Sequence, residues 1–166
     1  MPFNIAGGIS TLEEKSLGAI AKSGSRPLRG VLPYCVRPQG RGVYFMEGWE
    51  APHSLLASFA AAGATLSVFQ MGGEGLEGED PPVLGLAPQG VVAPTLLMTG
   101  NPSSARRMGR SIDFSSASVL EGSETIAQAG ERLFEKLLAV ASGELTRGET
   151  LGGEELVDLF LTGSAF

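Results

Sequence analysis

The stretch VVAPTLLMTGNP, residues 91–102, predicts a buried strand that is followed at once by the start of a helix. Its apolar run has the length of a strand inside a sheet and contains no charged residue. Asn101 is a favoured helix cap, and Pro102 suits the first helical position because no backbone N–H needs a partner there. We therefore predict a strand over residues 91–99 and a short helix that begins at Pro102.

The rest of the chain continues this alternation of helix and strand. Thr11, with Glu14 three residues later, forms a capping-box pattern, and the helix that follows is expected to end at Ser23–Gly24. We predict a short buried strand over residues 28–35, a strand over 64–70, a helix over 52–63 and an extended piece over 111–120. A long helix should follow a cap at Ser123, with an apolar stripe of Ile126, Leu133, Phe134, Leu137, Leu138 and Ala141.

This order of elements indicates an α/β fold: an open, mainly parallel sheet with helices on both faces, in a Rossmann-like three-layer arrangement. Ligands of such sheets bind beyond the carboxyl ends of the strands. The predicted ends are residues 70–73 and 99–101. The N-terminal segment, residues 4–8, joins a site there only if it folds over the same edge.

The composition predicts one globular domain over residues 1–166, because 43% of the residues are hydrophobic and 18% are charged. A net charge of −6 without a dense basic run argues against nucleic acid and anionic membranes as partners. Two small basic groups can still meet a small anion: Arg37 with Arg41, and Arg106 and Arg107 with Arg110.

The chain has one cysteine, Cys35, and one histidine, His53. An internal disulfide and a Cys/His zinc site are therefore excluded, and a reducing, cytoplasmic location is expected. Cys35 lies in an apolar stretch and is predicted to be a buried, inert thiol. We find no secretion signal and no apolar run long enough for a membrane span.

Candidate chemistry gathers near the N-terminus. Gly7 and Gly8 precede a predicted helix start, where backbone amides can bind a carboxylate or phosphate, although a tight turn that requires glycine is the simpler explanation. Glu13 and Lys15 offer the base and the cation that proton abstraction beside a carboxylate requires. Because adjacent helical residues point about 100° apart, these two and Glu14 cannot all face one substrate, and solvated side chains are the alternative.

No metal ligand set is identified from the residues. Oxygen ligands suited to Mg²⁺, Ca²⁺ or Mn²⁺ are present, but the acidic loop over residues 74–80 lacks the spacing of an EF-hand. We expect that loop to be a solvated run of charges.

The segment NIAGGISTLEEKSLGAIAKSG, residues 4–24, resembles the altronate and galactarate dehydratase family. In that family Asn-x-Ala-Gly-Gly is followed by Thr/Ser pairs and Glu-Glu-Lys-Ser-Leu-Gly. The likeness continues in order along nearly the whole chain, in the blocks GVLPYCVRPQGRGVYFM, LLASFAAAGATLSVFQ, APTLLMTGNP, ARRMGRSIDF and LFEKLLAVASGE. It covers only the C-terminal portion of a family member.

The resemblance implies removal of water from a six-carbon sugar acid such as altronate or galactarate, with a divalent metal, typically iron. Relatives in the family include a sulfolactate sulfo-lyase. The resemblance also implies a site lined by Asn4, Gly7, Gly8, Thr11, Thr99 and Asn101, with Glu13 and Lys15 in catalytic roles. Three departures favour a changed substrate or a lost activity: residues 71–90 replace a Gly-Arg-Gly-Thr-Pro loop, Gly109-Arg110-Ser111 replaces an acidic pair, and Ser115 stands where the family has Asn.

Two functions are consistent with these patterns. The first is the C-terminal domain of a metal-assisted hydro-lyase for a hexarate- or hexonate-type hydroxy acid, which needs an N-terminal portion or a partner chain. The second is a non-catalytic binding or scaffolding domain that keeps the family fold and associates with another chain. Both are compatible with a homo-oligomer.

Overall fold

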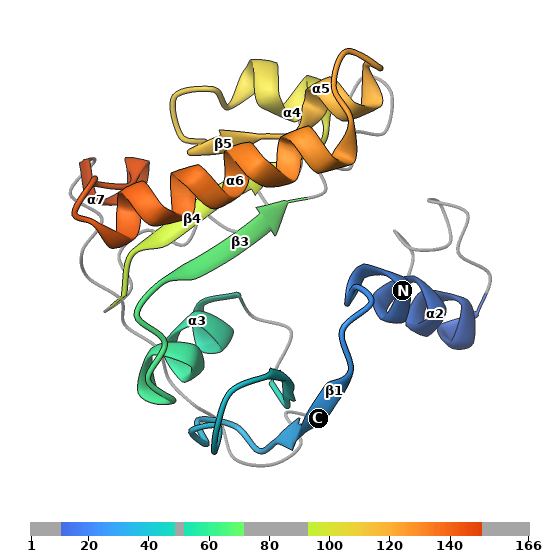
Figure 1. Cartoon of the computed structure of the whole chain (residues 1–166), viewed down its shortest axis with the longest axis vertical. Helices are drawn as coiled ribbons and strands as arrows, with labels where there is room; N and C mark the ends of the chain where they lie inside the picture. Colours follow the sequence, from blue (N-terminus) through green and yellow to red (C-terminus); the bar gives the residue numbers. More distant parts are fainter. Residues whose placement is uncertain (1–10, 49–51, 72–92, 151–166) are drawn as a thin grey trace, which may run out of the picture. The chain divides into compact units, whose positions relative to one another are not determined.

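The computed structural model describes residues 11–48, 52–71 and 93–150 of the chain. The chain divides into two compact units, Met1–Val31 with Pro38–Phe45 and Leu32–Arg37 with Met46–Phe166. Figure 1 shows the helices and strands of both, coloured along the sequence. A single domain over residues 1–166 stays a prediction, and the acidic loop at residues 74–80 lies outside the described residues.

The first unit contains helix α2, Leu12–Lys22, at the place that the sequence predicts. Thr11 is the N-cap, and its hydroxyl accepts a hydrogen bond from the backbone N–H of Glu14 at 3.1 Å. Ser23 is the C-cap, and Gly24 follows with a φ of +81°, which glycine adopts without steric cost. Local cap chemistry therefore sets both ends of this helix.

Strands β1, Leu28–Leu32, and β2, Val43–Met46, pair in a two-stranded sheet. The strand predicted over residues 28–35 exists in a shorter form, but the prediction that it is buried is wrong because Leu28 and Val31 are exposed. Two strands alone form too small a sheet to bury their side chains. The sequence analysis did not predict β2, whose four residues are too few for a clear alternation.

Cys35 lies in a turn after β1, not in a strand. The N–H of Val36 donates to the carbonyl of Pro33 at 3.1 Å, and Cys35 has a φ of +62° inside this turn. Proline cannot donate to a strand ladder, so the strand ends before it. The Cys35 thiol is exposed, and the prediction of a buried thiol is wrong.

The second unit contains a three-stranded sheet formed by β3 (Ser67–Met71), β4 (Thr95–Thr99) and β5 (Phe114–Ser115). The strand order is β3-β4-β5, and both pairs are parallel. The strands predicted over residues 64–70 and 91–99 are thus confirmed in their described parts. The extended piece predicted over 111–120 contains β5, but its second half is helical.

The described helices of this unit are α3 (Pro52–Ala61), α4 (Pro102–Arg107), α5 (Ala117–Leu120), α6 (Ile126–Ala141) and α7 (Arg147–Thr150). All five residues of β4 are buried, and because successive strand residues point to opposite faces, both faces are covered. Helix α6 lies along the sheet (Figure 1) and contributes to a core cluster of Leu96, Met98, Phe114 and Val140.

These contacts confirm the predicted α/β class with a parallel sheet and covering helices, although the sheet is small. Among the helices of the described ranges, none has the length and apolar character that crossing a membrane requires.

Helix α6 begins after Thr125, so the prediction of a cap at Ser123 is wrong. The Thr125 hydroxyl accepts from the N–H of Gln128 at 3.3 Å, and the Gln128 side chain accepts from the N–H of Thr125 at 2.9 Å. This reciprocal capping box satisfies two amides of the helix start. Ser123 instead donates its hydroxyl to the carbonyl of Ser118 at 3.3 Å, within the turn before the helix.

The predicted apolar stripe of α6 is divided between two environments. Leu133 and Leu137 pack against the core cluster, whereas Ile126, Phe134 and Leu138 are exposed. The outer half of the stripe is therefore largely exposed.

Asp113 joins β4 to the start of α7. Its backbone N–H donates to the carbonyl of Leu97 at 2.8 Å, and its Oδ2 accepts from the N–H of Leu97 at 2.8 Å. Its Oδ1 accepts from the N–H of Arg147 at 2.7 Å. Because Leu97 is buried, the Asp113 carboxylate supplies a partner that water cannot replace.

We predict that Asp113→Ala lowers the free energy of unfolding by about 1–3 kcal/mol, because it leaves the buried N–H of Leu97 without an acceptor. Urea denaturation measures this loss. The control is Glu121→Ala, which removes a surface ion pair with Arg106 at 3.5 Å and should cost less than about 0.5 kcal/mol. Equal losses in the two variants would contradict the role assigned to Asp113.

Candidate functional site

The three parallel strands of the second unit end at one edge of the sheet. Met71 at the end of β3 is in register with Thr99 at the end of β4, and Thr99 is in register with Ser115 of β5. Helix α4 follows β4, and α5 follows β5. This carboxyl edge is where sheets of this kind bind ligands.

Thr99 and Asn101 shape the chain at this edge. The Thr99 hydroxyl, on a residue that is 0% exposed, donates to the carbonyl of Met71 at 2.9 Å and accepts from the N–H of Asn101 at 3.1 Å. The Asn101 side chain accepts from the N–H groups of Ser103 and Ser104 at 2.8 and 3.2 Å, which confirms the predicted cap of α4.

Gly100 lets two turns approach each other at the same edge. A Cβ at this position would lie 3.3 Å from the Ser116 hydroxyl oxygen, closer than most side chains tolerate. The N–H of Ser116 donates to the carbonyl of Thr99 at 3.0 Å, so the turn after β5 is fixed against the turn after β4.

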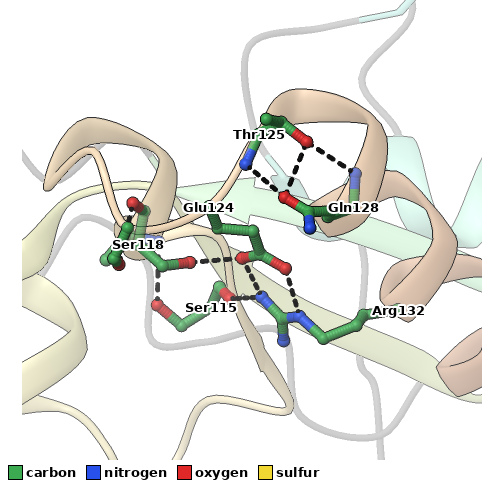
Figure 2. A network of polar contacts seen from close by, with 8 residues as sticks. Ser115, Ser118, Glu124, Thr125, Gln128 and Arg132 are labelled. Atoms are coloured by element: carbon green, nitrogen blue, oxygen red, sulfur yellow. Dashed lines mark hydrogen bonds and ion pairs between the residues drawn. The ribbon is translucent and has the colours of Figure 1, made fainter.

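An ion pair between Glu124 and Arg132 lies beside these turns (Figure 2). The Arg132 guanidinium donates from Nε and Nη2 to the two Glu124 carboxylate oxygens, each at 2.6 Å. Nη2 also donates to the carbonyl of Ser115 at 3.2 Å, and the Ser118 hydroxyl donates to Glu124. The guanidinium lies 4.8 Å from the ring centre of Phe114, so α6 is fixed to the end of β5.

The same contacts set the ionisation of the pair. Hydrogen bonds from Arg132 and then from Ser118 lower the pKa of the Glu124 carboxyl from 4.5 to about 2. The hydrogen bond to Glu124 raises the pKa of Arg132. Two-point contact between a guanidinium and a carboxylate is the strong form of a charge-assisted hydrogen bond. Near neutral pH both groups are therefore charged and matched to each other.

Two grooves adjoin this ion pair, and they share Ser118 and Arg132. One, of about 430 Å³, is lined by Arg106, Ser115 and Glu121 among others and lies between α4, α5 and α6. The other, of about 610 Å³, lies along α6 and is lined by Glu131 and Glu135. The smaller groove borders the strand ends and is lined by two arginines and two serines, Arg106, Arg132, Ser115 and Ser118.

The residues predicted for the site fall in different parts of the chain. Thr99 and Asn101 lie at the carboxyl edge of the second unit. Glu13 and Lys15 lie on α2 of the first unit and are exposed, and the Thr11 hydroxyl is the cap of that helix. That these groups meet stays a prediction. The other predicted site residues, Asn4, Gly7 and Gly8, lie outside the described residues.

Sequence reasoning missed Glu124 and Arg132. The two residues share no known motif, because Glu124 lies in the turn before the helix cap and only the fold brings it to Arg132, eight residues later. Ser115 was noted only as a departure from the family pattern. The one available signal was the basic group at Arg106, which the structure places at the smaller groove.

The described residues do not fit the divalent metal that the family resemblance implies. No group of three His, Cys, Asp or Glu side chains within these ranges is placed to hold an ion. Asp113 accepts from two backbone amides, and Glu124 accepts from Arg132 and Ser118. The carboxylates of Asp113 and Glu124 are therefore engaged in the fold.

Comparison with known proteins gives a consistent picture. The family model described as D-galactarate/Altronate dehydratase, C-terminal, matches residues 1–162. The chain is 35% identical to the (2R)-sulfolactate sulfo-lyase subunit beta of Chromohalobacter salexigens over 93% of this chain and 37% of the relative. It is 31% identical to the galactarate dehydratase (L-threo-forming) of Escherichia coli K12, over 86% of this chain and 25% of that enzyme.

A third relative, an altronate dehydratase of Bacillus subtilis strain 168, is 31% identical over 93% of this chain and 29% of its own length. The chain thus spans only 25–37% of the length of these curated relatives. The resemblance found from the sequence blocks is confirmed.

We predict that Glu124→Gln lowers the free energy of unfolding near neutral pH and that this deficit shrinks in acid. The pKa of the Glu124 carboxyl is about 2 in the folded chain and has an ordinary value of 4.5, so the carboxylate stabilises the fold above pH 4.5. That contribution is lost as the pH falls toward 2. Urea denaturation of wild type and variant, from near neutral pH down into this range, gives the difference.

Ser123→Ala is the matched control, because it removes a neutral side chain from the same turn. Its difference from wild type should not change with pH. A deficit of Glu124→Gln that is equal at both ends of the pH range would contradict the coupling of Glu124 to Arg132.

Proposed function

The chain belongs to the D-galactarate/altronate dehydratase C-terminal family, and from this membership we propose that it is the C-terminal domain of a hydro-lyase. Its substrate is a hexarate- or hexonate-type hydroxy acid. The observation that carries the proposal is the family match across residues 1–162, together with relatives named for galactarate, altronate and sulfolactate. Because the chain spans 25–37% of these relatives, the active unit also needs an N-terminal portion or a partner chain.

The reaction breaks a C–H bond next to a carboxylate and a C–O bond on the adjacent carbon. A base takes the proton, the hydroxyl group leaves as water, and the resulting enol becomes a keto group. The carboxylate must be held and its developing negative charge stabilised, since the proton is otherwise too weakly acidic. A site for this chemistry needs a cation, a base and donors for the hydroxyl groups.

Lys15 is our first choice for the residue that stabilises this charge, and Glu13 for the base. Side chains two residues apart on a helix point about 200° apart, so the two cannot approach the substrate from one face of α2. Lys15 is the better candidate of the two, because a cation acts on the carboxylate without exact alignment for proton transfer. Both assignments rest on the family resemblance of residues 4–24.

Within the second unit, the smaller groove is our candidate for binding the substrate. Arg106, which pairs with Glu121 at 3.5 Å on the surface, offers a guanidinium to a substrate carboxylate, and Ser115 and Ser118 line the same groove. Arg132 also lines the groove; it is held by Glu124 and donates to the carbonyl of Ser115. Thr99 and Asn101 position the two turns, and their direct contact with a substrate stays a proposal.

The divalent metal, iron by family resemblance, is likewise a proposal. The carboxylates near the described strands are engaged elsewhere, so ligands would have to come from outside the described residues or from the rest of the active unit. We assign no step to it.

A non-catalytic binding or scaffolding domain is the alternative. Its support is that Thr99, Asp113, Glu124 and Arg132 form hydrogen bonds with other groups of the fold. Such a domain keeps the family fold, binds another chain and holds at most a small anion.

We predict that Arg106→Ala weakens binding of galactarate, altronate or sulfolactate by about 10-fold or more, since a hydrogen bond to a charged group is worth about 1.5–3 kcal/mol. Isothermal titration of the isolated chain measures the affinity. Arg110→Ala is the control, because it removes a nearby exposed guanidinium that does not line the groove. Equal affinities for Arg106→Ala and wild type would reject this groove as the anion site.

Turnover separates the two functions. With an N-terminal partner encoded beside it and Fe²⁺, we expect the chain to convert galactarate or altronate to a keto acid with loss of water, or sulfolactate to a keto acid with loss of sulfite by the analogous break of a C–S bond. Lys15→Ala should reduce kcat at least 100-fold, in the range typical of one electrostatic group (about 10²–10³). Lys22→Ala, on the same helix, should leave kcat within about 2-fold of wild type. No turnover with any of the acids in the presence of the partner would contradict the hydro-lyase, and turnover by the isolated chain would contradict the scaffold.

A further inference from the structure

The outer face of α6 is an exposed apolar stripe. The side chains of Ile126, Phe134 and Leu138 are 79%, 61% and 52% exposed. With 3.6 residues per turn, these three share an arc of about 120° on the helix, and the small residues Ala127, Gly130 and Ala141 lie on the same arc. We call this set the outer stripe of α6.

The outer stripe adjoins the face that α6 uses for its own fold. Val140 is buried in the core cluster, and Leu133 and Leu137, which pack against that cluster, lie within about 20° of Ile126 around the helix axis. The exposed side chains of Phe134 and Leu138 extend the apolar surface about 60–100° beyond Leu137. Large exposed apolar side chains that are rimmed by charge mark a surface that another polypeptide covers.

Negative charge borders the outer stripe along one side. Glu131 and Glu135 are one turn apart and exposed, and neither makes an ion pair or hydrogen bond within the described part of the chain. Both line the groove of about 610 Å³. In that groove Arg132 balances Glu124, so two carboxylates remain uncompensated. A partner side chain that enters there is favoured if it is basic.

A second copy of this chain fits the stripe poorly. Two copies of α6 paired antiparallel about Phe134 bring the same helix flank of each copy together. Glu131 and Glu135 of one copy would then face the same residues of the other, and like charges at helix flanks are unfavourable. A helix whose apolar stripe is flanked by Lys or Arg meets the same surface with opposite charge.

We propose that the outer stripe of α6 docks a helix with apolar side chains flanked by Lys or Arg, carried by the part of the family's polypeptide that lies outside these 166 residues. The relatives contain further polypeptide outside the matched region, since this chain spans 37% or less of the length of each of them. The inference rests on the partner requirement of the proposed function, and it assigns a surface and a chemistry to that partner.

The test uses the folded 166-residue chain and synthetic 18-residue peptides that tile the uncovered length of the Chromohalobacter salexigens relative. Fluorescence polarisation measures their binding. We expect the binders to carry an apolar stripe with Lys or Arg beside it, and their affinity to fall with added salt. Phe134→Gln, and the double variant Glu131→Lys with Glu135→Lys, should each weaken binding by 10-fold or more.

Leu120→Gln is the matched control, because Leu120 is also an exposed apolar residue, at 73%, but lies on α5. It should leave the affinity unchanged, and the thermal midpoints of all variants should stay near that of wild type. No binding peptide, or binding that survives Phe134→Gln, would overturn the proposal. So would a dimer of the chain alone in sedimentation equilibrium that Phe134→Gln dissociates, since a second copy would then be the occupant.

These readouts do not depend on catalysis. Peptide binding without turnover would reject the hydro-lyase and leave the docking surface standing. Turnover with a partner that binds the Phe134→Gln variant as tightly as wild type would support the hydro-lyase and reject the docking surface.

Discussion

Burial of β4 on both faces is the constraint that organises the second unit. Leu96 and Thr99 are 0% exposed, and β4 has a parallel neighbour on each side. Polar groups on such a strand have no access to water and need partners within the protein. The Thr99 hydroxyl and the Asp113 carboxylate meet this need by bonding to backbone groups of β3 and β4. The same contacts then fix the turns that leave the sheet.

The candidate site is a consequence of this arrangement. Parallel strands place the ends of β4 and β5 at one edge, so the chain can leave the sheet only through adjacent turns. Arg132 donates to the carbonyl of Ser115 and so holds the turn that follows β5. Glu124 accepts from Arg132 and fixes its guanidinium. A groove lined by Arg106, Arg132, Ser115 and Ser118 therefore forms where the sheet ends.

Helix α6 links this groove to the outside of the molecule. Its first turns carry the ion pair at the strand edge, its inner face packs on the core, and its outer face exposes Phe134 and Leu138. A polypeptide docked on the outer stripe would lie next to Glu131, one residue from Arg132 in the sequence. The proposed docking surface and the proposed substrate groove thus share one helix.

The sequence by itself determined the features that depend on local chemistry. The cap at Thr11, the turn at Gly24, the Asn101–Pro102 helix start and the central strand follow from properties of a few neighbouring residues. The parallel α/β class follows from their order along the chain, and the family from blocks of specific residues. Local cues failed where neighbours compete, as at Ser123 and Thr125, where the reciprocal bond to Gln128 decides the cap.

Only the tertiary structure decided which side chains meet. The pairing of Glu124 with Arg132 depends on a turn that brings a loop residue onto the next helix, and no spacing rule encodes that. The division of the α6 stripe into a buried and an exposed half depends on how much of the sheet the helix covers. Burial is likewise a property of the assembled layers, which is why the apolar residues of β1 and the thiol of Cys35 are exposed despite their apolar surroundings in sequence.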